Sequence, residues 1–178
     1  MFDVSQRRRF LSETYGIKDY LYASDMTSND NHITFGTGVT YNYSSDGLTM
    51  TSSNDTENIA DFSVPNDAVM TGKIKFGNQK CQFPHLHHCC FYHSDSNYMA
   101  CYDELDPYGW ANRTQVNDVY ITLNTWYDFK IEFEGNTVKL YLNNNLIISK
   151  TVSTRTSLQT DFMSRNTSTI KDIQIKPL

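Results

Sequence analysis

The sequence has no long apolar run, no concentration of positive charge and no apolar leader. A membrane-spanning helix needs about 20 consecutive apolar residues, and no stretch approaches that length. The first eleven residues, MFDVSQRRRFL, lack the apolar core of a signal peptide. The formal charge is −5 and Lys and Arg do not form a stripe, which argues against binding to a phosphate backbone. We therefore expect neither a membrane span nor a nucleic-acid partner.

Residues that favour helices are also scarce. Ala, Leu and Glu are few, whereas Ser, Thr, Asn, Tyr and Phe are plentiful, a composition that favours strands and turns. A chain of 178 residues fits one domain and can bury a core without disulfides or a metal. No repeat or low-complexity linker divides it. The composition predicts a single all-β domain.

The clearest structural pattern lies between Thr125 and Thr151. Apolar residues alternate with polar ones over 129–133 and again over 138–142, with Glu134-Gly135-Asn136 between the two runs. Period-two alternation around a turn predicts an antiparallel hairpin with one apolar face. A run of three Asn residues then precedes the apolar segment 146–151. These features predict a three-stranded meander.

The Trp-Tyr that opens this meander, its Gly-Asn turn and the Leu-Tyr-Leu-Asn at 140–143 resemble the concanavalin A-like lectin/glucanase superfamily. The laminin G-like members are the most similar, and Thr169–Ile175 resembles their closing strand. The resemblance implies an antiparallel jelly-roll β-sandwich over residues 18–178. It does not by itself imply a function.

Residues 1–17 do not fit the jelly roll and are predicted to form a short helical or extended arm. Ser5 could begin a helix that runs to about Tyr15 and ends at Gly16. The arm is either a frayed terminus or an attachment segment that docks on a neighbouring subunit or another partner.

Short strands separated by turn residues are predicted next. The first, over 18–25, would pair beside the closing strand near Ile173. The others are expected at the following positions, with Asn54-Asp55-Thr56 as a turn: 32–37, 39–43, 47–51, 58–64 and 68–76.

All four cysteines and four of the five histidines lie between Cys81 and Cys101. Thiolate and imidazole are zinc ligands, and Cys81 with His85, or His87 with Cys89, could converge on a metal. The other interpretation is that strands 87–93 and 97–103 carry small apolar Cys side chains into the core, with the histidines on the opposite face or in the Pro84 loop. A disulfide from Cys89 or Cys90 to Cys101 is a further alternative, although a cytoplasmic assembly route would favour thiols.

A carbohydrate site is predicted in the same region and just after it. Aromatic rings stack on the apolar faces of sugars, and Asp or Asn fixes the hydroxyl groups. The alternative for each ring is a place in the core or over the sandwich edge. The predicted set is Tyr92, Tyr98, Tyr102, Asp103, Tyr108, Trp110 and Asn112.

Glu104-Leu105-Asp106 begins like the Glu-x-Asp-x-Glu strand of the retaining glucanases in the resembled superfamily. Tyr108 stands at the position of the acid and Pro107 interrupts the strand, so we expect no glycosidase activity. A catalytic Cys-His pair would need a Gly-rich oxyanion loop beside it. The sequence has no such loop, so we expect no nucleophilic catalysis by these residues. Laminin G-like domains often bind calcium at the sandwich rim, which makes Asp103 and Asp106, with Asn112, weak candidates for calcium ligands; no other cofactor is expected.

Two functional hypotheses follow from the sequence. The first is a non-catalytic module that recognises cell-surface or cell-wall glycans, as part of a phage or viral tail or of another adhesion apparatus. The second is a structural virion or assembly protein in which the jelly roll is a scaffold and the arm makes a homo-oligomer or virion contact. Both place the protein outside cells, on a virion or on a cell surface, without a signal peptide in this chain.

Overall fold

The computed structural model describes residues 22–29, 31–56, 58–60, 64, 67–153, 160–161 and 164–178. The predicted arm over 1–17, with its helix from Ser5, lies outside these residues. Among the described residues, no helix is long and apolar enough to cross a membrane.

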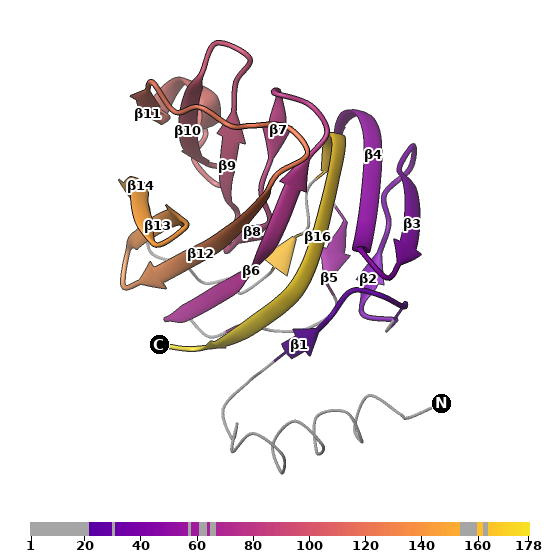
Figure 1. Cartoon of the computed structure of the whole chain (residues 1–178). Helices are drawn as coiled ribbons and strands as arrows, with labels where there is room; N and C mark the ends of the chain where they lie inside the picture. The colour runs from indigo at the N-terminus through magenta and orange to yellow at the C-terminus, as the bar shows by residue number, and fades with distance from the viewer. Residues whose placement is uncertain are drawn as a thin grey trace.

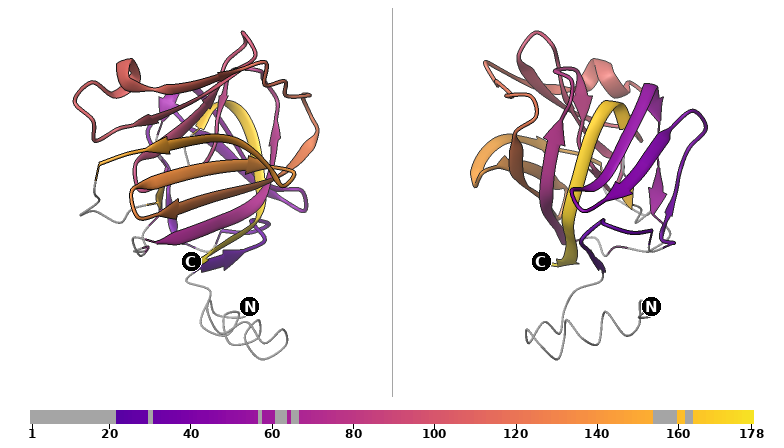
Figure 2. Two further views of the ribbon diagram at one scale, coloured as in Figure 1. Left: turned by 90° about the vertical axis from the view of Figure 1, so that its left-hand side faces the viewer. Right: turned by 45° about the vertical axis from the view of Figure 1, so that its right-hand side comes forward.

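One antiparallel sheet carries the predicted meander. Its strand order is β14-β13-β12-β6-β16-β4-β3, and β1 also pairs with β16. Figure 1 shows β12, β6 and β16 side by side in one curved layer, and the left view of Figure 2 shows the meander continuing that layer. The strands are β1 (Tyr22–Ser24), β3 (Thr40–Ser44), β4 (Gly47–Thr56), β6 (Ala68–Phe76), β12 (Trp126–Glu134), β13 (Thr137–Leu142), β14 (Asn145–Thr151) and β16 (Ser164–Pro177).

The second antiparallel sheet has the order β11-β10-β9-β8-β15-β5-β2, with β7 paired to β9. A short 3-10 helix, η1 (Gly109–Asn112), joins β10 to β11. The strands are β2 (Ile33–Thr34), β5 (Ile59–Ala60), β7 (Cys81–Gln82), β8 (His85–Leu86), β9 (Cys89–His93), β10 (Tyr98–Asp103), β11 (Thr114–Asn117) and β15 (Thr160–Asp161).

The core lies between the two sheets and follows from alternation along their strands. Phe129, Ile131 and Phe133 of β12 are buried, whereas the residues between them are partly exposed. Phe91 of β9 and Met99 of β10 are buried in the same apolar cluster from the facing sheet. The predicted all-β jelly-roll sandwich is confirmed.

Most predicted strands are present. The meander and the strand 68–76 are confirmed, and the closing strand is longer than predicted. Ser24 pairs with Ile173, as predicted for the first strand. β16 remains in register with the core because a bulge with Asp172 at φ 53° lets both Ile170 and Ile173 face inward.

Two local predictions are wrong. Residues 54–56 were predicted as a turn but belong to β4, where Thr56 pairs with Ser164; pairing with a neighbouring strand overrides the turn preference of Asn and Asp. His87 and His88 were predicted to open a strand, but they form the turn between Leu86 and Cys89, with φ of 54° and 59°. Of the predicted strand 58–64, residues 59–60 are described as a strand and 61–63 lie outside the described residues.

Gly47 provides a test of the packing between β4 and β16. Its φ is 118°, and a Cβ there would meet the carbonyl oxygen of Ile170; Gly38 also has a positive φ, 85°, but has open space around it. Gly38→Ala should cost about 1–2 kcal/mol of unfolding free energy from backbone strain alone. Gly47→Ala should cost about 3 kcal/mol or more, because overpacking adds to the strain. Urea unfolding measures both, and equal losses would contradict this account of the β4–β16 contact.

Candidate functional site

The hairpin of β9 and β10 presents a row of aromatic side chains on the outer face of its sheet. Tyr98, Ala100 and Tyr102 are alternate residues of β10, so their side chains lie on the same face of the sheet. Ala100 pairs with Tyr92 of β9. Cross-strand partners share a face of the sheet. Tyr92, Tyr98 and Tyr102 therefore lie on one face, opposite the one that carries Met99 into the core.

These rings line a hollow with a volume of about 390 Å³. We call it the aromatic hollow. Its described lining consists of Lys80, Gln82, Tyr92, Tyr98, Tyr102, Trp110 and Arg165.

Trp110 stands at the edge of the aromatic hollow, on η1. Its ring meets Tyr92 edge-on at 5.5 Å and Tyr102 at 5.4 Å between centroids. The Arg113 guanidinium lies 4.5 Å from the centre of the indole, a distance typical of a cation–π contact. Because Trp110 is still 40% exposed, part of its ring remains accessible to a ligand.

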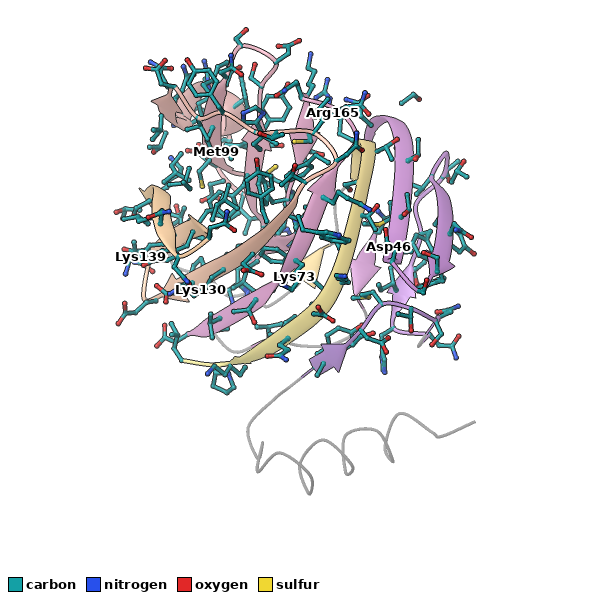
Figure 3. The ribbon with its side chains drawn as sticks, viewed as in Figure 1. Asp46, Lys73, Met99, Lys130, Lys139 and Arg165 are labelled. Carbon is teal, nitrogen blue, oxygen red and sulfur yellow. The ribbon has the colours of Figure 1, made fainter. Side chains whose placement is uncertain are left out.

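The polar groups of the hollow come from distant parts of the chain. Lys80 and Gln82 lie at or just before β7, and Arg165 lies near the start of β16 with its guanidinium 5.4 Å from the Tyr92 ring. Figure 3 places Arg165 at the top of the molecule, beside the start of β16. All three side chains donate hydrogen bonds, and Gln82 can also accept them. The sequence analysis missed these residues, since no local pattern joins 80–82 to 165.

The other predicted carbohydrate-binding residues lie elsewhere. Asp103 is 2% exposed, and its Oδ1 accepts a hydrogen bond from the Leu105 amide. Tyr108 is 71% exposed and is not among the residues that line the hollow. Asn112 donates to Asp106 Oδ2 at 2.9 Å, and its carbonyl oxygen accepts from Lys150 Nζ at 2.6 Å. The hydrogen bonds of Asp103 and Asn112 thus hold the loop that presents Trp110.

The carboxylates suggested for calcium are engaged within their own turns. Asp106 Oδ1 accepts from the Tyr108 amide at 2.8 Å, while Oδ2 accepts from Asn112. The hydrogen bond from Asn112, followed by that from Tyr108, holds the pKa of Asp106 below its ordinary value. Asp103 and Asp106 therefore stabilise local structure, and calcium binding by these residues stays a prediction.

The cysteines and histidines divide differently from the prediction. All four cysteines are buried thiols, and Cys81, Cys89 and Cys101 belong to the core as expected. The prediction that the histidines avoid the core is wrong for His87, which packs edge-on against Phe133 at 4.8 Å. His93 is also buried, with its ring nitrogens 2.7 Å from the carbonyl oxygens of Gln79 and Val119.

A different set of metal-ligand side chains converges on the outer face. One ligand atom from each of His85, Cys90 and Glu104 lies within 4.8 Å of the others. Burial raises the pKa of Glu104, but the polar contact with the His85 ring and the attraction to His85 and His88 together lower it by more, so the net pKa lies below its ordinary value. The pairs predicted from sequence, Cys81 with His85 and His87 with Cys89, are not the ones that form this group.

A second hollow of about 300 Å³ lies on the other sheet, over β6, β12 and β16. Its described lining includes Lys73 and Asp128, which form an ion pair at 2.8 Å, and Lys130. Phe129 is the aromatic residue among its described lining. It therefore lacks the set of stacking rings found in the aromatic hollow.

The two packed sheets and their closing strand define a concanavalin A-like jelly roll, and solved structures of that fold are similar to this chain. The carbohydrate binding module CBM66 from Bacillus subtilis has a TM-score of 0.68 at 15% identity, over 82% of this chain and 95% of that one. A Crh5 transglycosylase in complex with NAG has a TM-score of 0.66 at 12% identity, over 88% and 83%. The Bacillus licheniformis beta-glucanase has a TM-score of 0.66 at 10% identity, over 88% and 97%.

No protein-family model matches the chain, and no curated protein sequence matches it. At these low identities the structural similarity establishes the fold alone. The expected jelly-roll fold is confirmed, and the function of the chain must be argued from the residues of the site.

Asp106 should control how the loop holds Trp110. Because its folded pKa is lowered, the Asp106 contacts are present above its unfolded pKa of about 3.9 and are lost as pH falls through the folded value. In a Trp126→Phe background, Trp110 is the remaining tryptophan, so its fluorescence should show an acid transition that Asp106→Ala removes. Asp118→Ala, an exposed control, should keep the acid transition. An acid transition that persists in Asp106→Ala would contradict its assignment to Asp106.

Proposed function

We propose that the protein is a non-catalytic carbohydrate-binding module whose ligand occupies the aromatic hollow. The observation that carries the proposal is the convergence of Tyr92, Tyr98, Tyr102 and Trp110 on one hollow of the outer face. Aromatic rings provide flat apolar surfaces for the C–H faces of a sugar. Lys80, Gln82 and Arg165 supply donors for its oxygen atoms.

The similar structures support a saccharide as the ligand. One is named as a carbohydrate binding module, and another is a transglycosylase in complex with NAG. Their similarity to this chain extends over most of its length. The ligand class is therefore consistent with both the fold and the chemistry of the hollow.

The arrangement of the carboxylates favours binding over hydrolysis. A retaining glycosidase needs two carboxyl groups about 5 Å apart across the scissile bond. Glu104 follows the end of β10, whereas Asp106 lies in the next turn with both oxygens hydrogen-bonded. Asp103 is buried on the core side. The Glu104-Leu105-Asp106 segment thus does not continue as a strand that would align a nucleophile and an acid on one face.

The test is binding of the full-length protein to a panel of neutral and acidic glycans and cell-wall polysaccharides, with released reducing sugar measured in parallel. We expect binding without sugar release. Trp110→Ala should weaken binding about tenfold or more, because the indole is the most exposed of the rings that line the hollow.

Two exposed aromatic residues serve as controls. Tyr120 is 70% exposed and Tyr108 is 71% exposed, and neither is among the residues lining the aromatic hollow. Tyr120→Ala and Tyr108→Ala should leave the affinity unchanged. Failure of the wild-type protein to bind any glycan, or equal losses in all three variants, would overturn the proposal. Sugar release that Glu104→Gln abolishes would make the protein an enzyme.

We further propose that this binding serves adhesion at a cell or virus-particle surface, with the arm over residues 1–17 as the attachment segment. Deleting Met1–Gly16 should then abolish assembly or surface attachment while glycan affinity stays unchanged. Size-exclusion chromatography with light scattering, together with the glycan assay, measures the two properties separately. Unchanged assembly would contradict an attachment role for the arm, and parallel loss of glycan binding would show that the arm supports the domain itself.

A further inference from the structure

A cluster of three side chains lies beside the aromatic hollow and has no role in the proposed sugar binding. His87 and His88 form a turn that brings Leu86 opposite Cys89. The side chains of Leu86 and Cys89 enter the core. Alternation therefore puts the preceding residue, His85, and the following residue, Cys90, on the outer face. Glu104 completes the group from the end of β10, where its amide donates to the His88 carbonyl oxygen at 3.0 Å. We call His85, Cys90 and Glu104 the His85 cluster.

His85 is the unusual member of this cluster. Its side chain is fully buried, and neither ring nitrogen has a hydrogen-bond partner among the described residues. The Glu104 Oε2 atom lies 3.8 Å from Nδ1, which is too long for a hydrogen bond. Buried polar groups without partners are costly and rare. A cation held between the imidazole and the carboxylate would satisfy both groups.

The three donors identify the kind of cation. Thiolate, imidazole and carboxylate are the ligands that zinc uses, whereas calcium prefers oxygen atoms alone. One thiolate and one carboxylate also balance the charge of a divalent ion, which lowers the cost of burying it. Tetrahedral zinc with bonds of about 2.0–2.3 Å places its ligand atoms about 3.3–3.7 Å apart. The present separations, all within 4.8 Å, exceed that range by at most about 1.5 Å, a change that rotation of the side chains can supply.

We propose that His85, Cys90 and Glu104 bind one zinc ion. The His88 Nδ1 atom lies 3.9 Å from Glu104 Oε2, so this imidazole flanks the carboxylate without hydrogen-bonding to it. Gln82 connects this site to the aromatic hollow, because its Nε2 donates to Cys90 Sγ at 3.7 Å while the same residue lines the hollow. Bound zinc would therefore fix the strand face on which the sugar-binding rings stand.

The test is titration of the chelator-stripped, full-length protein with Co²⁺ and then Zn²⁺. We expect one equivalent of Co²⁺ to produce the near-ultraviolet charge-transfer absorption of a cobalt–thiolate bond, and one equivalent of Zn²⁺ to remove it. Zn²⁺ should also raise the melting temperature, because it binds the folded state. Metal analysis of protein purified without chelator should find zinc.

Matched variants assign the ligands. Cys90→Ala should abolish the cobalt–thiolate absorption, whereas Cys101→Ala, at a buried cysteine of the core, should keep it. Glu104→Gln changes a partly exposed side chain with little change in shape, so it should remain folded. It should weaken Zn²⁺ binding about 100-fold or more, since loss even of outer-shell partners costs about 10–100-fold.

The proposal is overturned if no cobalt–thiolate absorption appears, if Cys90→Ala retains it, or if Glu104→Gln binds Zn²⁺ as tightly as the wild-type protein. If Cys90→Ala does not fold, the Zn²⁺ affinities of Glu104→Gln and His85→Gln test the proposal instead. Wild-type Zn²⁺ affinity in these variants would overturn it. These readouts need no glycan, so the zinc site and the sugar site succeed or fail independently.

Discussion

Alternation along β9 and β10 is the constraint on which both the core and the candidate site depend. Cys101 pairs with Phe91 on the inner face, and Ala100 pairs with Tyr92 on the outer face. A slip of one residue in this register would exchange the two sets, turning Phe91 to the outer face and Tyr92 into the core. The same pairing that fills the sandwich therefore also gathers the aromatic rings. A substitution that weakens the inner face should disturb the outer one as well.

The outer face of this sheet combines an accessible part with a buried one. Trp110 remains 40% exposed at the edge of the aromatic hollow, whereas His85 and Cys90 are fully buried nearby. Gln82 belongs to both parts through its contact with Cys90. Stacking surfaces and hydrogen-bond donors suit a saccharide, and the sulfur, nitrogen and oxygen donors of the buried part suit a metal ion. The outer face of one sheet thus carries side chains suited to two distinct kinds of chemistry.

Local patterns explain what could be predicted from the sequence. The meander β12–β14 was predictable because alternation and turn residues lie within one continuous segment. Tyr92, Tyr98 and Tyr102 were predictable as a group because they follow the period of two neighbouring strands. The His87–His88 turn was missed because two-residue hairpin turns with positive φ usually contain Asn and Gly. Arg165 was missed because its place beside Tyr92 depends on contacts between segments far apart in the chain.

Glycan binding in the aromatic hollow is tested most directly by an NMR titration that follows the aromatic ring signals during addition of a glycan bound by the wild-type protein. We expect the signals of Trp110, Tyr102 and Tyr98 to shift together with one affinity, because these rings share the aromatic hollow. The ring signals of Trp126, which contacts Lys75 and Lys171 on the surface of the opposite sheet, should not move. Shifts confined to Trp126 and its neighbours would place the sugar on the other sheet and contradict glycan binding in the aromatic hollow.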